Sequence, residues 1–228
     1  MADIISKILK VFQENGLFEE GVELIGSWCF SLYQRHLGVK SFPLRTPDID
    51  FIIPRPFKGK KKPNFINQLE SLGFKIDFNS DGSIYLWNAE LKIEFLTCEK
   101  GRGTDHAIEI KELGFKATPL RYMSILLDKP IMINDRGIKV KAPNPVSFCL
   151  HKLLVASKRK KPDKKLKDIE QAVLVSAIIE ADQLRTAFIS LPKKWQKTIL
   201  DIIKFASTKM PMLNSEINHL RITLHKEK

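Results

Sequence analysis

Apolar residues recur at helical spacing at the start of the chain. Over residues 4–12 they stand three or four positions apart, and Gly16 follows where this pattern ends. One face of a helix repeats about every 3.6 residues, and a glycine often follows a helix. The spacing therefore predicts an amphipathic opening helix.

Short apolar or alternating runs follow, with turn-forming residues between them. They predict strands at residues 22–26, 48–54, 74–78, 83–89 and 91–97. Helical patterns cover residues 27–38 and 64–72. Gly38 and Gly73 are placed to end these helices, and Asn64 is placed to cap the second one. One β-rich sheet with flanking helices accounts for the chain up to about Cys98.

The pattern changes after Cys98. Residues 100–106 read as a polar loop, residues 117–127 look helical, and residues 131–143 predict a hairpin that turns at 135–137. Beyond that point only helical stripes occur, over residues 144–157, 163–180, 191–207 and 212–225. Prolines stand near the start of three of them, as is common for the first turn of a helix.

The sequence therefore predicts an α+β protein. A mixed β-sheet with flanking helices is expected over residues 1–110, a connecting helix and hairpin over 111–144, and a helical C-terminal domain over 145–228.

Composition indicates a folded, soluble chain. Its 228 residues are 43% hydrophobic, which is enough for one large core or two small ones. No run approaches the roughly 20 apolar residues that span a bilayer, and the first residues do not resemble a secretory signal. Cys29, Cys98 and Cys149 are odd in number and far apart, which argues against disulfides and a zinc site. We expect reduced thiols, a cytoplasmic location and no membrane association.

The positive charge of the chain indicates a class of partner. The net charge is +12, with dense lysine clusters at residues 57–63 and 157–167. Strongly positive surfaces favour phosphate-bearing partners, although either cluster taken alone is equally consistent with solvated lysines.

Asp48 and Asp50 are the first candidates for chemistry. Residues two apart on a strand point to the same face, so both carboxylates project together while Ile49 turns to the core. Divalent cations neutralise such pairs, and Mg²⁺ takes one or two carboxylates together with substrate phosphates. The alternative is a surface strand with two solvated acids.

Glu94 supplies a third acid in the middle of an apolar strand. Three acids on adjacent strands can hold two cations that stabilise the attacking and leaving oxygens of a phosphoryl transfer. The alternative is an ion pair between Glu94 and a lysine on the open face of the sheet.

Gly26 and Ser27 stand where a predicted strand ends and a helix begins. The exposed N–H groups of a helix start favour phosphate oxygens, glycine permits close approach, and serine can both cap the helix and donate its hydroxyl. No Walker loop or G-x-G-x-x-G pattern occurs in the sequence.

In order and in strand context, Gly26-Ser27, Asp48-x-Asp50 and Glu94 resemble the DNA polymerase β-like nucleotidyltransferase superfamily. The resemblance implies a nucleotidyltransferase-like sheet. It also implies a bound nucleoside triphosphate with Mg²⁺, or Mn²⁺ in its place. Asp48 and Asp50 would then be ligands of the metals that carry the triphosphate, and Glu94 the acceptor-side metal ligand. The spacer between Gly26-Ser27 and Asp48 is longer than in minimal members of the superfamily.

A second segment, residues 143–172, is similar to an uncharacterised bacterial group described only as having a nucleotidyltransferase fold. That group also tolerates the long spacer and the TPDID form of the acid motif. More distantly, the chain is similar to nucleotidyltransferase toxins of abortive-infection systems.

Basic residues of the C-terminal part are candidates for nucleotide binding. Lys152 and Arg159 lie seven residues apart on one predicted helix face, and Lys167 and Asp168 lie on the next helix. Such cations can neutralise a triphosphate. A solvated basic face, or a pairing of Asp168 with Lys164 within its own helix, is the alternative.

The hypothesis from the sequence is a Mg²⁺-dependent nucleotidyltransferase. It would move a nucleoside monophosphate from a triphosphate to a hydroxyl of RNA, a protein or a small molecule, with release of pyrophosphate. RNA would contact the two lysine clusters. The alternatives are a non-catalytic module that binds nucleic acid or another partner, and a hydrolase that uses the same metal site.

Overall fold

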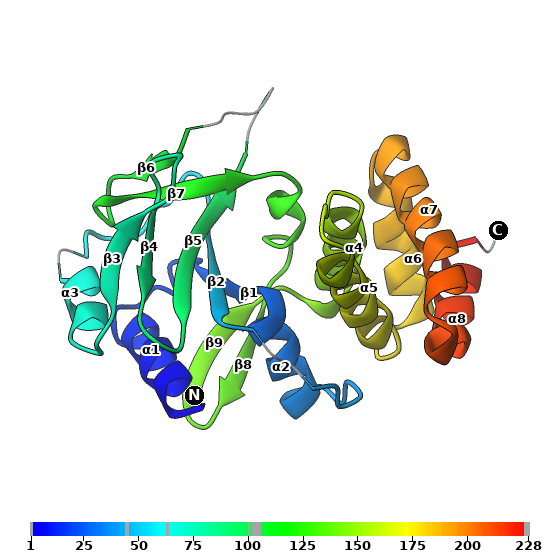
Figure 1. Cartoon of the computed structure of the whole chain (residues 1–228), viewed down its shortest axis with the longest axis horizontal. Helices are drawn as coiled ribbons and strands as arrows, with labels where there is room; N and C mark the ends of the chain where they lie inside the picture. Colours follow the sequence, from blue (N-terminus) through cyan, green and yellow to red (C-terminus); the bar gives the residue numbers. More distant parts are fainter. Residues whose placement is uncertain (1, 44–45, 63, 100, 102–105, 226–228) are drawn as a thin grey trace. The chain divides into compact units, whose positions relative to one another are not determined.

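The structure is a computed structural model that describes residues 2–43, 46–62, 64–99, 101 and 106–225. The chain divides into two compact units (Figure 1). Unit 1 comprises Met1–Leu32 and Pro43–Pro143, and unit 2 comprises Tyr33–Phe42 and Asn144–Lys228. Unit 1 thus contains most of the segment that the sequence suggests as a connection, residues 111–144.

Unit 1 consists of a mixed sheet, flanking helices and a separate hairpin. Its elements in chain order are α1 (Ala2–Glu14), β1 (Glu23–Ile25), the first part of α2 (Gly26–His36), β2 (Asp48–Ile53), α3 (Phe65–Glu70), β3 (Lys75–Phe78), β4 (Ile84–Trp87), β5 (Lys92–Cys98), β6 (Ile108–Ile110), β7 (Phe115–Leu120), the 3₁₀ helix η1 (Met123–Ile125), β8 (Ile131–Asp135) and β9 (Ile138–Ala142).

The sheet has the strand order β1-β2-β5-β4-β3. β5 is central: it runs parallel to β2 along one edge, and its other edge pairs with β4 near the start of the strand and with β7 near its end. β1–β2 and β3–β4 are antiparallel pairs, and β6 adds to β7. The strands predicted for residues 22–97 are therefore confirmed.

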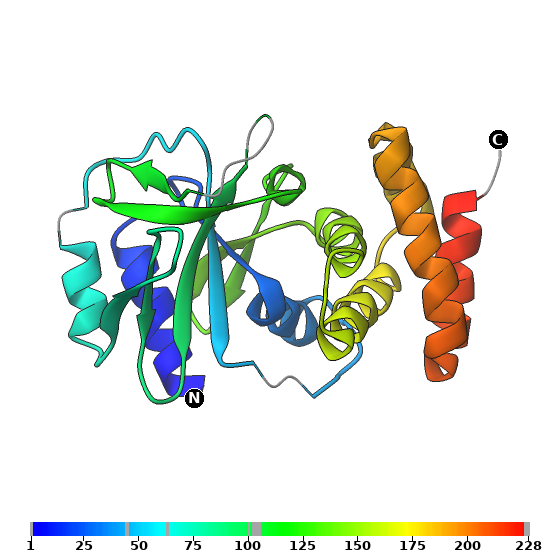
Figure 2. The ribbon, with the colours of Figure 1, turned by 45° about the horizontal axis from the view of Figure 1, so that its top comes forward.

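One face of this sheet, the core face, is covered by α1 and α3, which lie beside each other (Figure 2). Phe12 of α1 stacks on Phe51 of β2 with ring centroids 3.7 Å apart, and Phe65 of α3 meets both Phe12 and Phe95 edge to face. All four rings are buried. Aromatic burial of this kind contributes about 2 to 3 kcal/mol per side chain, so this cluster fixes the two helices on the sheet.

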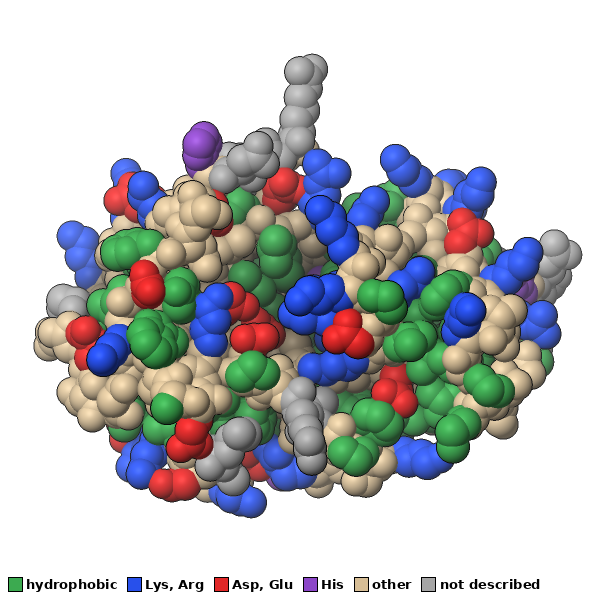
Figure 3. All heavy atoms as spheres, viewed as in Figure 1, with side chains coloured by type: hydrophobic (Ala, Val, Ile, Leu, Met, Phe, Trp, Pro, Cys, Tyr) green, Lys and Arg blue, Asp and Glu red, His purple; other side chains and the backbone are tan. Residues whose placement is uncertain are grey.

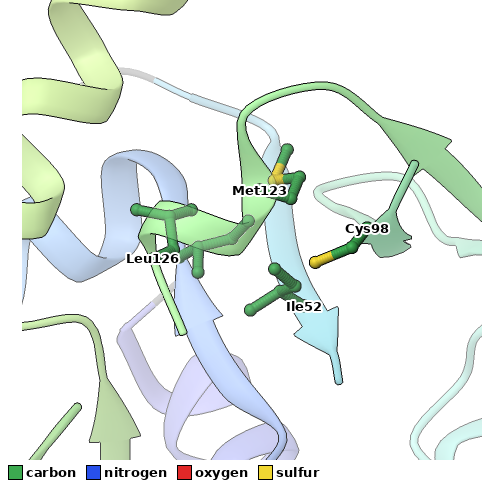
Figure 4. Packing of buried hydrophobic residues seen from close by; sticks show 5 residues of the cluster. Ile52, Cys98, Met123 and Leu126 are labelled. Carbon is green, nitrogen blue, oxygen red and sulfur yellow. The ribbon is translucent and has the colours of Figure 1, made fainter. Parts of the chain in front are cut away.

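The opposite face, the acid face, changes character along the strands. Asp48 and Asp50 lie at the start of β2 and are half-buried, whereas Ile52, on the same face, is fully buried. Ile52 packs in a cluster with Cys98, Met123 and other apolar residues (Figure 4). η1 thus closes the later half of this face.

The segment around η1 was predicted as a helix over residues 117–127, and this is wrong. Residues 115–120 form β7, whose side chains alternate between buried and less buried positions, and only Met123–Ile125 is helical. Pairing with β5 and β6 overrides the local helical pattern. β6 was not predicted, and of the predicted loop 100–106, residues 100 and 102–105 lie outside the described residues.

Other local predictions for unit 1 mostly hold. The hairpin β8–β9 turns at Arg136 and Gly137, both with positive φ as a two-residue turn requires. The opening helix ends before Gly16, which has φ +68°. α3 forms, but Asn64 makes no side-chain cap hydrogen bond there.

Unit 2 is helical. It contains the end of α2, α4 (Pro145–Ala156), α5 (Pro162–Ser176), α6 (Ala181–Ser190), α7 (Lys193–Lys209), the 3₁₀ helix η2 (Pro211–Leu213) and α8 (Asn214–His225). α6 was not predicted. Pro145 and Pro162 occupy first helical turns, and Asn144 caps α4 by accepting a hydrogen bond from the N–H of Ser147. Tyr33 of α2 packs edge to face on Phe148 of α4.

Three properties expected from composition can be compared with the structure. Cys29, Cys98 and Cys149 are buried and form no disulfide with one another, as predicted. Across the described residues, each helix is too short or too polar to cross a membrane. Lysine and arginine side chains are spread over the surface in view, with acidic side chains among them (Figure 3).

Candidate functional site

The three predicted acids lie on the acid face of unit 1. Asp50 of β2 is the direct register partner of Glu94 on β5, and Asp48 is the partner of Lys92. Parallel pairing of these strands places residues of equal parity on one face, so Asp48, Asp50 and Glu94 share it. All three acids are half-buried.

Gly26 lies beside the acid pair. It follows β1, whose last residue Ile25 is the register partner of Asp50, and it has φ +68°. A Cβ atom at position 26 would lie 2.3 Å from Oδ2 of Asp50, closer than real Cβ contacts come. The Asp50 carboxylate therefore occupies the space that any other residue at this position would need. Glycine permits this close approach of the Asp50 carboxylate. The close approach of a phosphate to Gly26, for which the sequence makes this residue a candidate, stays a prediction.

Gly26 and Ser27 also form the first turn of α2. Ser27 is buried, with 7% of its surface exposed. The N–H groups of a first helical turn have no partner within the helix and carry partial positive charge. This end of α2 is thus suited to bind anions next to Asp50.

Lys92 is the basic residue that contacts the candidate acids on the acid face. Its Nζ lies 2.5 Å from Oε1 of Glu94 and 4.1 Å from the ring centroid of Tyr85. The alternative in which Glu94 pairs with a lysine is therefore present in the structure. Glu94 can bind a metal ion only if it gives up or shares its contact with Lys92.

The three acids share a face without forming a closed metal site. In the part of the chain that the structure describes, no three His, Cys, Asp or Glu side chains are arranged as a group that could hold a metal ion. The donor set itself consists of carboxylate oxygens, which Mg²⁺ prefers. The Asp50 carboxylate also rests against a glycine at a helix start, where phosphates would meet it. The residue types thus fit Mg²⁺, while Glu94 faces Lys92.

The acid face continues into an aromatic pair that the sequence reasoning missed. Tyr85 of β4 is the register partner of Glu94, and Trp87 is the partner of Lys92. The Tyr85 hydroxyl donates to Oδ2 of Asp77 on β3 at 3.0 Å, and Trp87 is 41% exposed. The alternation of aromatic residues in 83–89, facing the Lys92-x-Glu94 strand across a hairpin, is the pattern that would have revealed this pair.

The basic candidates of unit 2 form an ion-pair cluster around Asp168. Lys152 Nζ donates to Oδ1 of Asp168 at 2.7 Å, and Arg159 Nε donates to Oδ2 at 2.6 Å. The carboxylate is thus bound from outside its helix, and no Asp168–Lys164 ion pair occurs among the described residues. α4 ends at Ala156, so Arg159 lies in the connection to α5 and not on the face of Lys152.

Burial and neighbouring charges shift the pKa values in this cluster. Asp168 is 3% exposed, and although burial itself disfavours its charge, Lys152 and Arg159 lower its pKa. His151 beside it is also buried. Burial, helped by the charge of Lys152, lowers the pKa of His151 to about 3, so the imidazole is neutral. Lys167, the remaining candidate, is half-buried on α5.

One buried acid had no sequence prediction. Glu23 of β1 is 1% exposed, and its Oε2 has no hydrogen-bond partner among the described residues. Burial raises its pKa to about 8, an effect that Lys141 opposes. The run VELIG, with one acid inside an apolar strand, was the only indication of it.

Comparison with solved structures gives distant likenesses. An antigenic nucleotidyltransferase-like protein from Paracoccidioides brasiliensis matches with a TM-score of 0.49 and 15% identity over 93% of each chain. ANT(2")-Ia in complex with adenylyl-2"-tobramycin matches with a TM-score of 0.47 and 12% identity, over 82% of this chain and 95% of that chain. The solution structure of the antibiotic-resistance factor ANT(2'')-Ia matches with a TM-score of 0.39 and 14% identity, over 82% and 93%. No curated protein sequence matches the chain.

A comparison with protein families is more direct. The sequence profile of a family described as nucleotidyltransferase matches residues 4–196. This range contains the first turn of α2, the acids of β2 and β5, and the Asp168 cluster. Since the match covers well over half of the sequence and runs through both units, the chain belongs to the nucleotidyltransferase family.

Proposed function

We propose that the acid face of unit 1 transfers a nucleoside monophosphate from a nucleoside triphosphate to an acceptor hydroxyl. The observation that carries the proposal is the register of Asp50 with Glu94, with Asp48 on the same face and the start of α2 against Asp50. Membership of the nucleotidyltransferase family supports transfer of a nucleotidyl group in general.

In this proposal the oxygen of the acceptor hydroxyl attacks the α-phosphorus. The new O–P bond forms as the bond from the α-phosphorus to the bridging oxygen breaks, and pyrophosphate leaves with that electron pair. The hydroxyl proton passes to a carboxylate of the acid face, a role that suits Glu94. Catalysis is mainly positioning and neutralisation of charge.

Each candidate residue of unit 1 would contact either the metal ion or the triphosphate. Asp48 and Asp50 would hold Mg²⁺ on the triphosphate side, and Glu94 would hold it on the acceptor side after giving up Lys92. When bound, Mg²⁺ supplies positive charge to the triphosphate and to the attacking oxygen. Gly26 and Ser27 would bind phosphate oxygens through the first turn of α2. The predicted nucleotide contacts of Lys152, Arg159, Lys167 and Asp168 stay predictions.

The test is incorporation of label from each α-³²P nucleoside triphosphate, with Mg²⁺ and a cell extract that supplies acceptors. We compare the wild type with the double variant Asp48→Asn, Asp50→Asn. Asp77→Asn is the matched control, because Asp77 is an exposed acid on the same face of the edge strand β3.

We expect label in macromolecular or small-molecule products with the wild type and the control, and none with the double variant. Equal incorporation by the double variant would place the activity elsewhere. If no triphosphate labels any product with the wild type, the non-catalytic module is the better description. Release of labelled monophosphate without transfer would instead support the hydrolase.

A further inference from the structure

A cavity of about 700 Å³ lies in unit 1 on the core face, away from the acids. Ile76 and Phe78 of β3 and Ile84 of β4 line it, and their strand parity places them opposite Tyr85 and Asp77. Its volume falls in the range of ligand sites, roughly 300 to 1,000 Å³. Nothing in the proposed transfer reaction uses this cavity.

The rim of the cavity is basic. Lys61 and Lys62 come from the lysine cluster at residues 57–63, and Lys111 and Lys116 come from the β6–β7 hairpin, with Glu112 as the acid among them. Lys62 pairs with Glu20. Lys61, Lys111 and Lys116 make no ion pair with any residue that the structure describes. Folding thus brings two separate basic segments to one site.

Specific contacts hold the lysine-rich segment in place. Glu20 Oε1 accepts hydrogen bonds from the N–H of Lys60 at 3.1 Å and from Nζ of Lys62 at 2.9 Å. The N–H of Lys62 donates to the carbonyl of Glu112 at 3.0 Å, which ties the segment to the hairpin. The lysines therefore do not have to be gathered when a ligand binds, which reduces the entropic cost of binding.

The apolar part of the site is open to solvent. Phe78 is 66% exposed and Ile76 is 39% exposed, although both lie beside buried strand residues. An exposed aromatic ring next to unpaired cations is the combination with which proteins bind single-stranded nucleic acid: the ring stacks on a base and the cations contact phosphates.

The edge of β3 argues against an alternative ligand, an acidic peptide that adds as a strand. Asn79 N–H donates to Ser83, so by the alternation of an antiparallel pair the backbone of Ile76 and Phe78 faces the open edge. The N–H of Phe78 is taken by Oδ1 of Asp77 at 2.7 Å. A donor that an added strand needs is thus already in use.

We propose that this cavity binds single-stranded nucleic acid, with a base stacked on Phe78 and phosphates on Lys61, Lys111 and Lys116. The apolar part of the site lies on the core face, opposite the acids of the proposed transfer reaction. Lys116 lines the cavity from its rim, since its strand parity is that of Thr118 and Leu96. Binding can be measured without any nucleoside triphosphate, and its outcome does not depend on whether the chain is catalytically active.

The experiment measures fluorescence anisotropy of labelled 12-nucleotide oligo(U) and oligo(dT) with the full chain, from 50 to 300 mM salt. The test variants are Lys61→Ala, Lys111→Ala, Lys116→Ala combined, and Phe78→Ala alone. The matched controls are Lys193→Ala, Lys194→Ala, Lys197→Ala combined, three exposed lysines of α7, and Ile189→Ala, another exposed apolar residue. Thermal unfolding of every variant checks that the fold is intact.

We expect the triple variant of the cavity to lower the slope of log K against log salt by about 2, because each phosphate contact on a single strand contributes about 0.7. Phe78→Ala should weaken binding about tenfold with the slope unchanged, as loss of one stacked base does. Both controls should bind as the wild type does. Polyphosphate, used as a competitor, should displace the oligonucleotides equally well from the wild type and from Phe78→Ala at matched occupancy.

Two results overturn the proposal. If the two triple variants lose the same affinity, binding depends on the net charge of the chain and not on the cavity. If Phe78→Ala binds both oligonucleotides as tightly as the wild type does, there is no stacking at this site.

Discussion

Oδ2 of Asp50 lies where a side chain at Gly26 would begin, with only 2.3 Å to the position of a Cβ atom. The acid that the sequence assigns to metal binding is therefore in direct contact with the first residue of the helix assigned to phosphate binding. The two motifs are far apart in the sequence, and the antiparallel register of β1 with β2 joins them.

This contact predicts that Gly26→Ala is more harmful than its backbone conformation explains. Gly38, after the other end of α2, also has positive φ, but a Cβ there meets nothing within 4 Å. Gly38→Ala should cost about 1 kcal/mol of unfolding free energy for its left-handed backbone, and Gly26→Ala about 2 to 4 kcal/mol because the carboxylate is also displaced. Urea denaturation measures both. In an Asp50→Ala background the extra cost should vanish, and equal costs in the wild-type background would contradict the contact.

Lys92 is predicted to compete with a metal for Glu94. Its Nζ lies 2.5 Å from Glu94, and both side chains are about 30% exposed. Lys92→Met should tighten Mn²⁺ binding by about two- to fivefold, since a partly exposed ion pair contributes up to about 1 kcal/mol. Titration by electron paramagnetic resonance, without nucleotide, measures the change. Lys75→Met is the control, because Lys75 lies on the same face over Trp87. The two variants should differ, and equal affinities would count against Glu94 as a ligand.

Much of the fold was predictable because local patterns and tertiary structure agree. The hairpin at Arg136 and Gly137 has the turn residues that its two-residue turn requires. The strand of Asp48 and Asp50 has the alternating pattern that a strand requires. The helix predicted for residues 117–127 was wrong because the apolar spacing there fits a helix. Pairing with β5, which is distant in sequence, instead makes the first part of this segment a strand.

The candidate site was predictable in its residues and less so in its contacts. Strand parity places Asp48 and Asp50 on one face, and the parallel register of β2 with β5 adds Glu94 to it. The Lys92–Glu94 pair depends on side-chain rotamers, which no sequence pattern specifies. The partners of Asp168 depend on the packing of α4 against α5, which brings Lys152 sixteen residues away into contact.

The Asp168 cluster predicts a large loss of stability when its acid is neutralised. Asp168→Asn leaves Lys152 buried without a counter-charge, which should cost about 3 to 5 kcal/mol of unfolding free energy. Asp163→Asn, an exposed acid in the first turn of the same helix, should cost less than about 1 kcal/mol. Chemical denaturation at pH 7 measures both. The double variant Lys152→Met, Asp168→Leu should recover most of the loss, and an Asp168→Asn protein as stable as the control would show that the cluster contributes little.

The same cluster predicts a dependence on acid. The pKa of Asp168 lies below its ordinary value of 3.8, so the folded state binds the proton more weakly than the unfolded state does. The stabilisation is then fully present above pH 3.8 and is lost as the pH falls through the lowered pKa. The difference in stability between the wild type and Asp168→Asn should therefore narrow below about pH 4. A difference that stays constant down to pH 3 would exclude this linkage.

Glu23 predicts the opposite trend at higher pH. Burial raises its pKa from 4.5 to about 8, so the folded state holds a proton that the unfolded state releases. Between those values the unfolded state binds fewer protons, and the unfolding free energy should fall as the pH rises, by at most about 4 kcal/mol. Glu23→Gln removes the ionisation, so it should match the wild type near pH 4.5 and be more stable than the wild type at pH 8. Urea midpoints measured from pH 4.5 to 8 test this, with exposed Glu19→Gln as the control. A Glu23→Gln protein whose stability parallels the wild type over that range would show that Glu23 is ionised in the folded chain.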